Sequence, residues 1–343
     1  MKKLWLLSPL FGLIWSACSN EFEVAAPYKD IPVVYAIISP DDTAHYIRIE
    51  RVFIDPDKSA YDVARIPDSI YYAENAITVF LERVSTGDRF QMSRVDGNLE
   101  GHEREPGAYA QSPNWLYKVK PSQVGAIVKS GEKYKLVIER ADGRPPVTAE
   151  TTVPNVLTLV LPDPFGIPQI IAFSEDDPTK INWRTSPSAV IFDVYLNIRY
   201  RELSAAPTVT DTIRWRAAKG IIRENNPVSG GVFVARTSIT AQAFYQTLLD
   251  NIDTQADVQR YFNGIDLEFQ GAGPEIVEYQ EVAAINGGLT GAEISTRYTN
   301  LSEGFGIFTA KKTWRFNNFQ LNPASLEELN SDPTRRNLLK FKG

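Results

Sequence analysis

Residues 190–202 read VIFDVYLNIRYRE and carry the clearest strand signal in a chain of 343 residues. Apolar and polar side chains alternate along the whole stretch, which is the two-residue period of a strand that buries one face. Residues 208–217 follow as its expected antiparallel partner, so this part of the chain should form a sheet. The face expected to be buried carries Phe192, Val194, Leu196, Ile198 and Tyr200, and the opposite face carries Asp193, Tyr195, Asn197, Arg199 and Arg201.

The sequence around this strand predicts a second β-rich domain over residues 181–343, of fibronectin III-like character and with one or two short helices. A helix is expected through residues 243–249, because Ser238 or Thr240 can cap it and its apolar residues recur at three- and four-residue spacing. Asn263-Gly264 has the composition of a turn. The other expected elements are strands at 181–184 and 265–269, a strand or short helix at 275–284, and a short helix at 324–329.

The preceding part of the chain predicts an N-terminal domain over residues 31–154. Short β-branched and aromatic runs are separated by turn residues such as Gly131 and Asp142-Gly143, with almost nothing helical between them. This spacing favours a β-sandwich of immunoglobulin-like or transthyretin-like type. Residues 155–180, punctuated by prolines, are expected to connect the two domains. The predicted strands are residues 31–38, 46–53, 76–84, 115–119, 133–140 and 147–153.

The first residues, MKKLWLLSPLFGLIWSACSNEFE (1–23), predict a lipoprotein signal peptide at residues 1–17. Two lysines lead an apolar run of about 14 residues, which is too short to span a membrane. The only cysteine of the chain, Cys18, follows small residues where cleavage is expected and resembles the acylated Cys of a bacterial lipobox. Trp15 stands where a lipobox usually has Leu, so an ordinary secretory signal is the alternative. Cleavage would leave a lipid-anchored chain with a tether at residues 18–30.

The residues after Cys18 narrow the expected location. They are similar to the acidic, aromatic-containing export signal of surface lipoproteins of the Bacteroidota, which predicts anchoring in the outer membrane with the protein facing the cell surface. The periplasmic face is the alternative. The anchor would be a diacylglycerol and an acyl chain such as palmitate on Cys18, and no other cofactor is expected. The predicted export signal comprises Ser19, Asn20, Glu21, Phe22 and Glu23.

The composition argues against some classes of function. Hydrophobic residues make up 43% of the chain and charged residues 23%, so a packed core is expected. The formal net charge is −6, and loss of Lys2 and Lys3 with the signal peptide would lower it by two to −8. An acidic protein is a poor candidate for nucleic-acid binding, which needs clustered Lys and Arg.

Residues with catalytic or metal-binding chemistry are few. Only two histidines are present, His45 and His102, and both are expected on the solvated surface. No G-x-S-x-G nucleophile motif accompanies them, so no hydrolase triad is predicted. Zinc lacks ligands, and the acidic groups within residues 55–62 and 175–177 lack the spacing of a calcium loop. The sequence therefore predicts neither an enzyme nor a metal site.

Gly304 and Gly306 flank Phe305 near the end of the chain. Two glycines around an aromatic residue predict a tight bend that returns Ile307 and Phe308 to a core. A glycine-rich bend next to an aromatic ring is also suited to docking another protein. Gly304, Phe305 and Gly306 are therefore a candidate partner-binding site as well.

Three short motifs match the Asp, Ser or Thr, aliphatic pattern of O-glycosylation in Bacteroidota envelope proteins. The candidate acceptors are Thr43, Ser69 and Thr212. A three-residue pattern arises easily by chance, so these motifs support export without defining a function.

Several segments in the same order resemble a Bacteroidota cell-envelope lipoprotein family, the one catalogued as domain of unknown function 4249. The resemblance covers nearly all of the chain after the tether, and it implies a lipoprotein of β-sandwich character that accompanies large outer-membrane β-barrels. No reaction is established for the family, so no catalytic residue is carried over. The segments are residues 30–35 (DIPVVY), 42–48 (DTAHYIR), 148–154 (TAETTVP), 298–300 (YTN) and 304–308 (GFGIF).

The expected function is that of a non-enzymatic accessory or structural subunit of an outer-membrane β-barrel assembly. Candidate assemblies are a TonB-dependent transporter, the barrel-insertion machinery and a secretion apparatus. Such a subunit should expose an apolar surface patch that only a partner covers. The alternative is a surface module that binds glycans or other nutrients, which should present aromatic rings in a groove beside amide and carboxylate groups.

Overall fold

The computed structural model describes residues 31–52, 59–121, 126–203, 209–228, 230–255, 258–286 and 297–342. The predicted signal peptide, the predicted lipidation site Cys18 and the predicted export signal lie outside these residues. The fold is mainly β, as predicted, with one large mixed sheet, one small sheet and a few short helices. Within the described residues, no helix is both long and apolar enough to cross a membrane.

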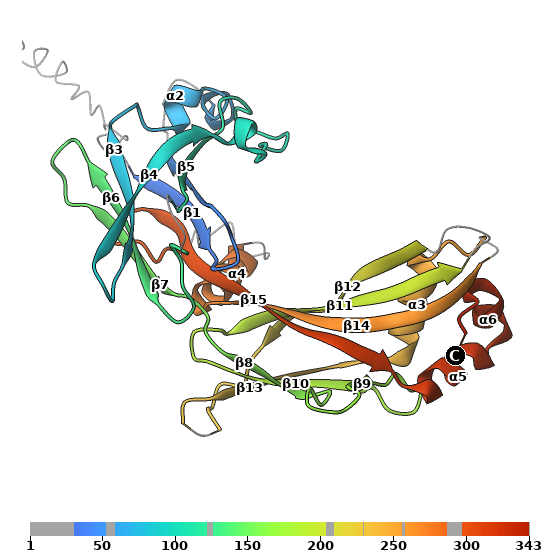
Figure 1. The fold of residues 1–343 in the computed structure, drawn as a ribbon. Coiled ribbons are helices and arrows are strands. Elements are labelled where there is room, and N and C mark those ends of the chain that lie inside the picture. Colours follow the sequence, from blue (N-terminus) through green and yellow to red (C-terminus); the bar gives the residue numbers. More distant parts are fainter. Residues whose placement is uncertain are drawn as a thin grey trace, which may run out of the picture.

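The strands and helices group into two bodies (Figure 1). The first body, coloured mainly blue to green in Figure 1, holds all six predicted N-terminal strands and one further strand, β4. Its elements are β1 (Pro32–Ile38), β2 (His45–Arg51), α1 (Ala60–Val63), α2 (Pro67–Ile70), β3 (Ile77–Arg83), β4 (Asp88–Asp96), η1 (Gly97–Glu100), β5 (Trp115–Val119), β6 (Lys133–Arg140), β7 (Val147–Thr152) and, from late in the chain, α4 (Pro274–Asn286) and part of β15 (Phe305–Leu321).

The first body is one sheet that folds back on itself around a core. Its strand order is β15-β1-β2-β5-β4-β3-β6-β7. Strand β4 forms the corner, because it pairs with β3 as far as Met92 and with β5 from Ser93 onward. On the far side, Ala149 of β7 bridges to Leu301, which brings the two ends of the sheet together. The core between the two halves includes Val34, Ile47, Val79, Leu136 and Phe308.

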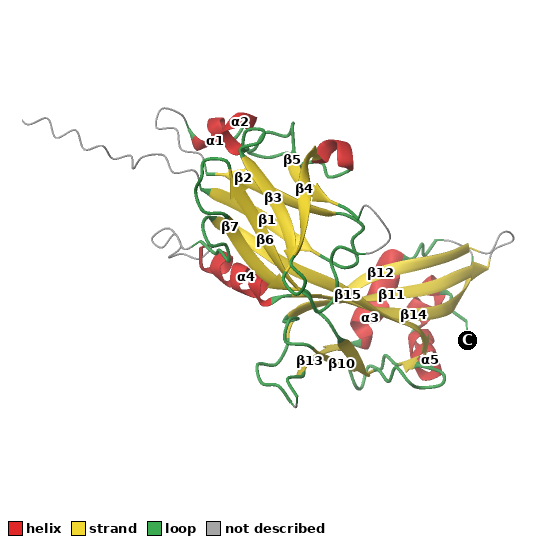
Figure 2. Ribbon diagram, turned by 60° about the vertical axis from the view of Figure 1, so that its left-hand side comes forward, coloured by secondary structure: helices red, strands yellow, loops and turns green. Residues whose placement is uncertain are grey.

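The second body is a sandwich of two sheets. The sheet β12-β11-β14-β15 faces the small sheet β13-β10-β8 across a core in which Trp183 is fully buried. Figure 2 shows α3 and α5 on the same side of the large sheet as β10 and β13. The elements are β8 (Leu157–Leu161), β9 (Ile170–Ile171), β10 (Thr179–Thr185), β11 (Ile191–Leu203), β12 (Val209–Ile222), β13 (Phe233–Ile239), α3 (Ala241–Asn251), β14 (Gln259–Ala272), the rest of β15, α5 (Pro323–Ser331) and α6 (Pro333–Leu339).

The strand predicted from residues 190–202 is confirmed as β11. All five side chains of its expected core face are buried, and β12 pairs with it as its antiparallel partner. The predicted cap of α3 is also confirmed, because Thr240 Oγ1 accepts a hydrogen bond of 3.2 Å from the backbone N–H of Ala243. The alternation of apolar and polar residues and the capping chemistry of Thr240 were therefore sufficient to predict these two elements.

The turn predicted at Asn263-Gly264 is wrong, because both residues lie inside β14. Gly264 has a φ of +112°, and the pairing of β14 with β11 shifts between Arg199 and Tyr200 at this level. The glycine therefore marks a bulge within a continuous strand instead of a reversal of the chain. Residues 155–180, predicted as a connector, contribute β8 and β9 and several core side chains of the second body.

Strand β15 belongs to both bodies. Its first part, residues 305–310, pairs in parallel with residues 33–38 of β1, and its second part pairs antiparallel with β14. Leu301, Phe308 and Ala310 therefore lie in the core of the first body, although they follow nearly the whole second body in the sequence. The first body is thus built from residues 31–154 together with a segment from near the end of the chain.

Gly304 and Gly306 allow β15 to approach β1. Their φ angles are +109° and +110°, a region that favours glycine. A Cβ atom on Gly306 would overlap the backbone carbonyl of Val34, and one on Gly304 would overlap that of Pro32. Ile307 and Phe308 are buried, which confirms the predicted return of the chain to a core.

A substitution at Gly306 tests this junction. We expect Gly306→Ala to lower the free energy of unfolding by more than about 3 kcal/mol, because a Cβ there must push β15 away from the β1 backbone. The control is Gly87→Ala, whose φ is also positive but whose Cβ would meet no atom within 4 Å, and which should cost only about 1–2 kcal/mol. Urea unfolding measures both. Equal losses of unfolding free energy in the two variants would show that the close approach of β15 to β1 is not what requires glycine at position 306.

Candidate functional site

Strand β8 lies at the edge of the small sheet. Among the described strands it pairs with β10 alone, so its other edge has no strand beside it. Leu157 and Leu159 point into the core, whereas Thr158 and Val160 are exposed. An unpaired edge strand is a ready site for the addition of another strand.

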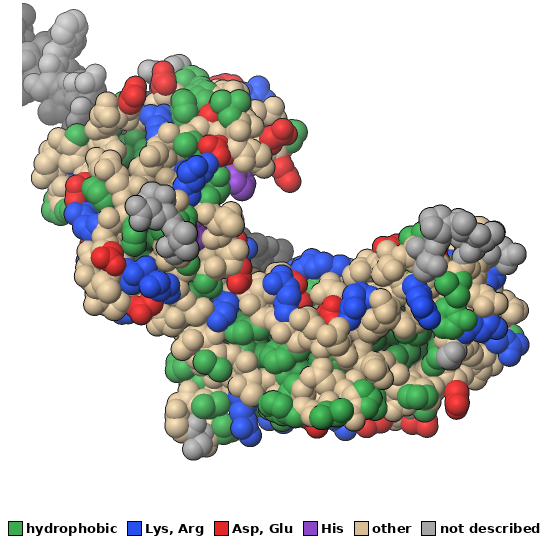
Figure 3. Space-filling model, in the orientation of Figure 1, with side chains coloured by type: hydrophobic (Ala, Val, Ile, Leu, Met, Phe, Trp, Pro, Cys, Tyr) green, Lys and Arg blue, Asp and Glu red, His purple; other side chains and the backbone are tan. Residues whose placement is uncertain are grey.

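The loop from β8 to β9 exposes large apolar side chains. Phe165 is 81% exposed and Ile167 is 99% exposed. Figure 3 shows hydrophobic side chains gathered along the lower side of the second body, where the small sheet lies. We call the set around β8 and this loop the apolar patch, and it comprises Val156, Val160, Leu161, Phe165, Ile167 and Ile170.

The loop that carries the apolar patch is internally hydrogen-bonded. Asp163 Oδ1 accepts a hydrogen bond of 2.9 Å from the backbone N–H of Phe165, and the side-chain amide of Gln169 donates to the carbonyl of Pro164. The carbonyl of Gln169 in turn accepts from the N–H of Gln320 on β15, at 2.8 Å. Both apolar side chains are therefore displayed from a fixed backbone.

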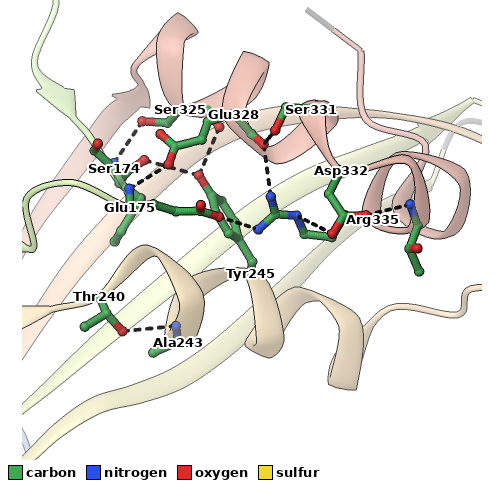
Figure 4. Close-up of polar contacts among 12 residues, drawn as sticks. Ser174, Glu175, Thr240, Ala243, Tyr245, Ser325, Glu328, Ser331, Asp332 and Arg335 are labelled. Carbon is green, nitrogen blue, oxygen red and sulfur yellow. Dashed lines mark hydrogen bonds and ion pairs between the residues drawn. The ribbon is translucent and has the colours of Figure 1, made fainter.

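The segment after β9 is fixed to α3 and to the C-terminal helices α5 and α6 (Figure 4). The N–H of Phe173 donates to Ser325 Oγ at 2.8 Å, and the Tyr245 hydroxyl donates to the carbonyl of Phe173 at 3.3 Å. Burial raises the pKa of Tyr245 to about 12, so the hydroxyl stays protonated as a donor. Arg335 of α6 holds the carboxylate of Glu175 at 3.0 Å, which engages one member of the acidic group at 175–177. These contacts fix the chain on the C-terminal side of the apolar patch.

The opposite outer face of the second body is polar and internally paired. The buried carboxylate of Glu268 on β14 accepts hydrogen bonds from Arg214 at 2.8 Å and from Arg315 at 3.0 Å. Arg199 is bound to Asp266 at 3.1 Å on the same face. These charged groups pair with one another on the outer face of the large sheet, whereas the most exposed large apolar side chains of this body, Phe165 and Ile167, lie in the loop after β8.

The glycine-rich bend lies at the junction of the bodies. Gly304 and Gly306 serve the approach to β1, and Phe305 is half-buried with the guanidinium of Arg297 5.1 Å from its ring centre. Helix α4 packs beside this bend, where Thr309 Oγ1 donates to the Glu275 carboxylate at 2.9 Å. Partner binding at this bend stays a prediction.

The three candidate O-glycosylation residues lie at separate places. Thr43 is exposed in the turn between β1 and β2, and Thr212 is exposed on β12 at the edge of the large sheet. Ser69 is half-buried in α2, and its carbonyl accepts a hydrogen bond of 3.2 Å from Arg51. Their modification stays a prediction.

The expectation that His45 is solvated is wrong. His45 is buried because it shares the inward face of β2 with Ile47 and Ile49. Its Nδ1 has no hydrogen-bond partner among the described residues, and burial lowers the pKa of the imidazole. His102 is exposed, as expected, with its ring centre 4.2 Å from that of Tyr46.

The patch was missed at the sequence level. Residues 160–168 read VLPDPFGIP, in which three prolines isolate single apolar residues from any strand or helix period. Large apolar residues that fit neither the strand period nor the helix period indicate exposure on the surface. In the sequence alone, however, the surrounding prolines give this segment the composition of a connector.

The patch should contribute nothing to the stability of the chain by itself. We expect a Phe165→Ser/Ile167→Ser double variant to unfold within about 1 kcal/mol of the parent, because both side chains are solvated already. The contrasting variant is Phe173→Ala, which removes a fully buried ring stacked on Phe244 and should cost about 3–5 kcal/mol. Urea unfolding compares them, and a large loss in the double variant would place the patch inside the fold.

Glu275 should make stability depend on pH. Burial raises the pKa of this carboxyl above its ordinary value of 4.5. The folded state therefore binds more protons than the unfolded state above that pH, so stability is lost as pH rises from 4.5 through the raised pKa. We expect Glu275→Gln to increase the urea midpoint at pH 7 and to change it little at pH 4. A difference that is independent of pH would contradict the assignment.

No protein-family model matches the sequence, and no curated protein matches it. Support for a function comes from the residues of the chain and from their geometry.

Proposed function

We propose that the protein is a lipid-anchored outer-membrane lipoprotein that acts as a non-enzymatic accessory subunit of a β-barrel assembly. The observation that carries this proposal is the apolar patch, with Phe165 and Ile167 held in solvent on an ordered loop. Burying two such side chains contributes about 3–6 kcal/mol before the cost of association. A surface of this kind is expected where another protein covers it.

The mode of contact follows from the position of the patch. The free edge of β8 offers backbone hydrogen-bonding groups to an extended segment of the partner, and Val160 and Leu161 flank that edge. Strand addition takes its affinity from backbone hydrogen bonds and its specificity from the adjoining side chains. We propose that a segment of the barrel protein lies along β8 with Phe165 and Ile167 packed over it.

The anchor is supported by the sequence. Cys18 ends an apolar signal segment, and the following residues, 19–23, are similar to a surface-export signal. Two or three acyl chains hold a protein stably on a membrane, which one chain does not. Confinement of both proteins to one membrane raises their effective concentration, so a modest patch is sufficient for a lasting complex. The resemblance to lipoproteins that accompany outer-membrane barrels supports the same proposal.

A pull-down tests the proposal. The tagged full-length protein is extracted from outer membranes in mild detergent, and co-purifying proteins are identified by mass spectrometry. We expect a stoichiometric β-barrel protein, with recovery at least about 10-fold lower for Phe165→Ser/Ile167→Ser. Leu99→Ser is the matched control, because Leu99 is 87% exposed in the first body and lies outside the patch. Cys18→Ala should leave the membrane fraction.

Each measurement has an outcome that contradicts one part of the proposal. Absence of a stoichiometric β-barrel protein would contradict the accessory role. Full recovery with the double variant, or an equal loss with Leu99→Ser, would remove the patch as the contact. Retention of Cys18→Ala in the membrane fraction would contradict the lipid anchor.

A further inference from the structure

The corner of the first body contains an opening in the sheet. Strand β4 leaves β3 after the pair Val79 and Met92, and it joins β5 from the pair Ser93 and Lys118. Continued register would place Ile77 opposite Arg94, but β3 and β4 no longer pair there. The two strands part, and backbone groups of both face the gap.

The gap leads into a cavity of about 440 Å³. This volume lies in the range of small-molecule sites. Residues from three strands and from the turn before β3 line it, and the polar and aromatic ones among them are Glu74, Asn75, Thr78, Gln91, Ser93, Arg94, Trp115 and Tyr117. The cavity thus combines rings, amides and a carboxylate in one place, as expected of a module that binds sugars.

Arg94 is the cation of this cavity. Its guanidinium lies 4.4 Å from the ring centre of Trp115, which fixes it over the indole. In the described part of the chain it makes no hydrogen bond and no ion pair. Arg89 on the same strand shows the contrast, because it also lies over a ring, that of Phe80, but binds Glu139 at 2.8 Å. The donors of Arg94 are thus left for an anion, and a guanidinium binds a carboxylate through two parallel hydrogen bonds.

The neighbouring polar groups are also unengaged. The hydroxyl of Tyr117 forms no hydrogen bond with the described residues, and burial raises its pKa, so it remains a donor. The side chains of Asn75, Gln91 and Glu74 likewise form no hydrogen bond with another described side chain. Amides and a carboxylate together accept from and donate to vicinal hydroxyls.

We infer that this cavity binds an acidic sugar residue, a hexuronate, with its carboxylate on Arg94 and Tyr117 and its hydroxyls on Asn75, Gln91 and Glu74. A neutral sugar would leave the guanidinium unpaired, and an uncharged sugar face cannot stack on the side of Trp115 that Arg94 covers. The site lies in the first body, whereas the apolar patch lies in the second. The inference goes beyond the accessory role and does not rest on it.

Calorimetric titration of the full-length protein in detergent tests the inference. The probes are methyl β-D-glucuronide, methyl β-D-glucoside and glycine. We expect the glucuronide to bind, and the glucoside to bind at least about 10-fold more weakly because it lacks the carboxylate. Arg94→Gln should weaken glucuronide binding at least about 10-fold, and Tyr117→Phe should weaken it less. Arg89→Gln is the matched control and should bind as the parent does.

The outcomes separate the possibilities. Urea midpoints of each variant show whether a loss of binding comes from unfolding, and Tyr117→Phe, which keeps the ring, serves if Arg94→Gln does not fold. No heat with the glucuronide at about 10 mM would overturn the site. Equal affinity for glucoside and glucuronide, or parental affinity in Arg94→Gln, would overturn the role of the carboxylate. Tighter binding of glycine would replace the sugar by an amino acid and overturn the ligand class.

Discussion

The close approach of the Gly306 backbone to Val34 is the constraint on which the two-body arrangement depends. It lets one strand leave the core of the first body and enter the large sheet of the second without a break. The junction is then reinforced on both sides: the N–H of Thr313 donates to Asp41 at 2.7 Å, and the carbonyl of Asn155 accepts from the indole of Trp314 at 3.1 Å. The two bodies are therefore joined by a continuous, hydrogen-bonded strand instead of a flexible linker.

The far end of the second body is held by a buried cation. Arg260 on β14 is fully buried, and it donates to Glu202 at 2.7 Å and to the backbone carbonyls of Leu339 and Asp253 at 3.1 and 2.8 Å. A buried charge is tolerated only when its hydrogen bonds are satisfied, and here its partners come from three separate segments. The C-terminal helices are thereby fixed to the sheet, and through them the segment that follows the apolar loop.

The sequence predicted those parts of the fold whose signal is local. Residues 190–202 alternate throughout, and Thr240 has the chemistry of a cap, so β11 and α3 could be placed. Strand β4 was missed because DRFQMSRVD carries few apolar residues, one of its faces being solvated and its end turning a corner. The pairing of β15 with β1, the apolar patch and the gap beside Arg94 all depend on which distant segments meet, and no local period records that.

The pairing of the first strand with the last has a consequence for biogenesis. The backbone of β1 meets residues 305–310 only after some 270 further residues have been made, a separation that the contact between Asp41 and Thr313 gives as 272. At about 5–20 residues per second this amounts to tens of seconds. Throughout that interval the edge of β1 that later receives β15 has no partner strand, so the fold of the first body is completed only when synthesis is nearly over.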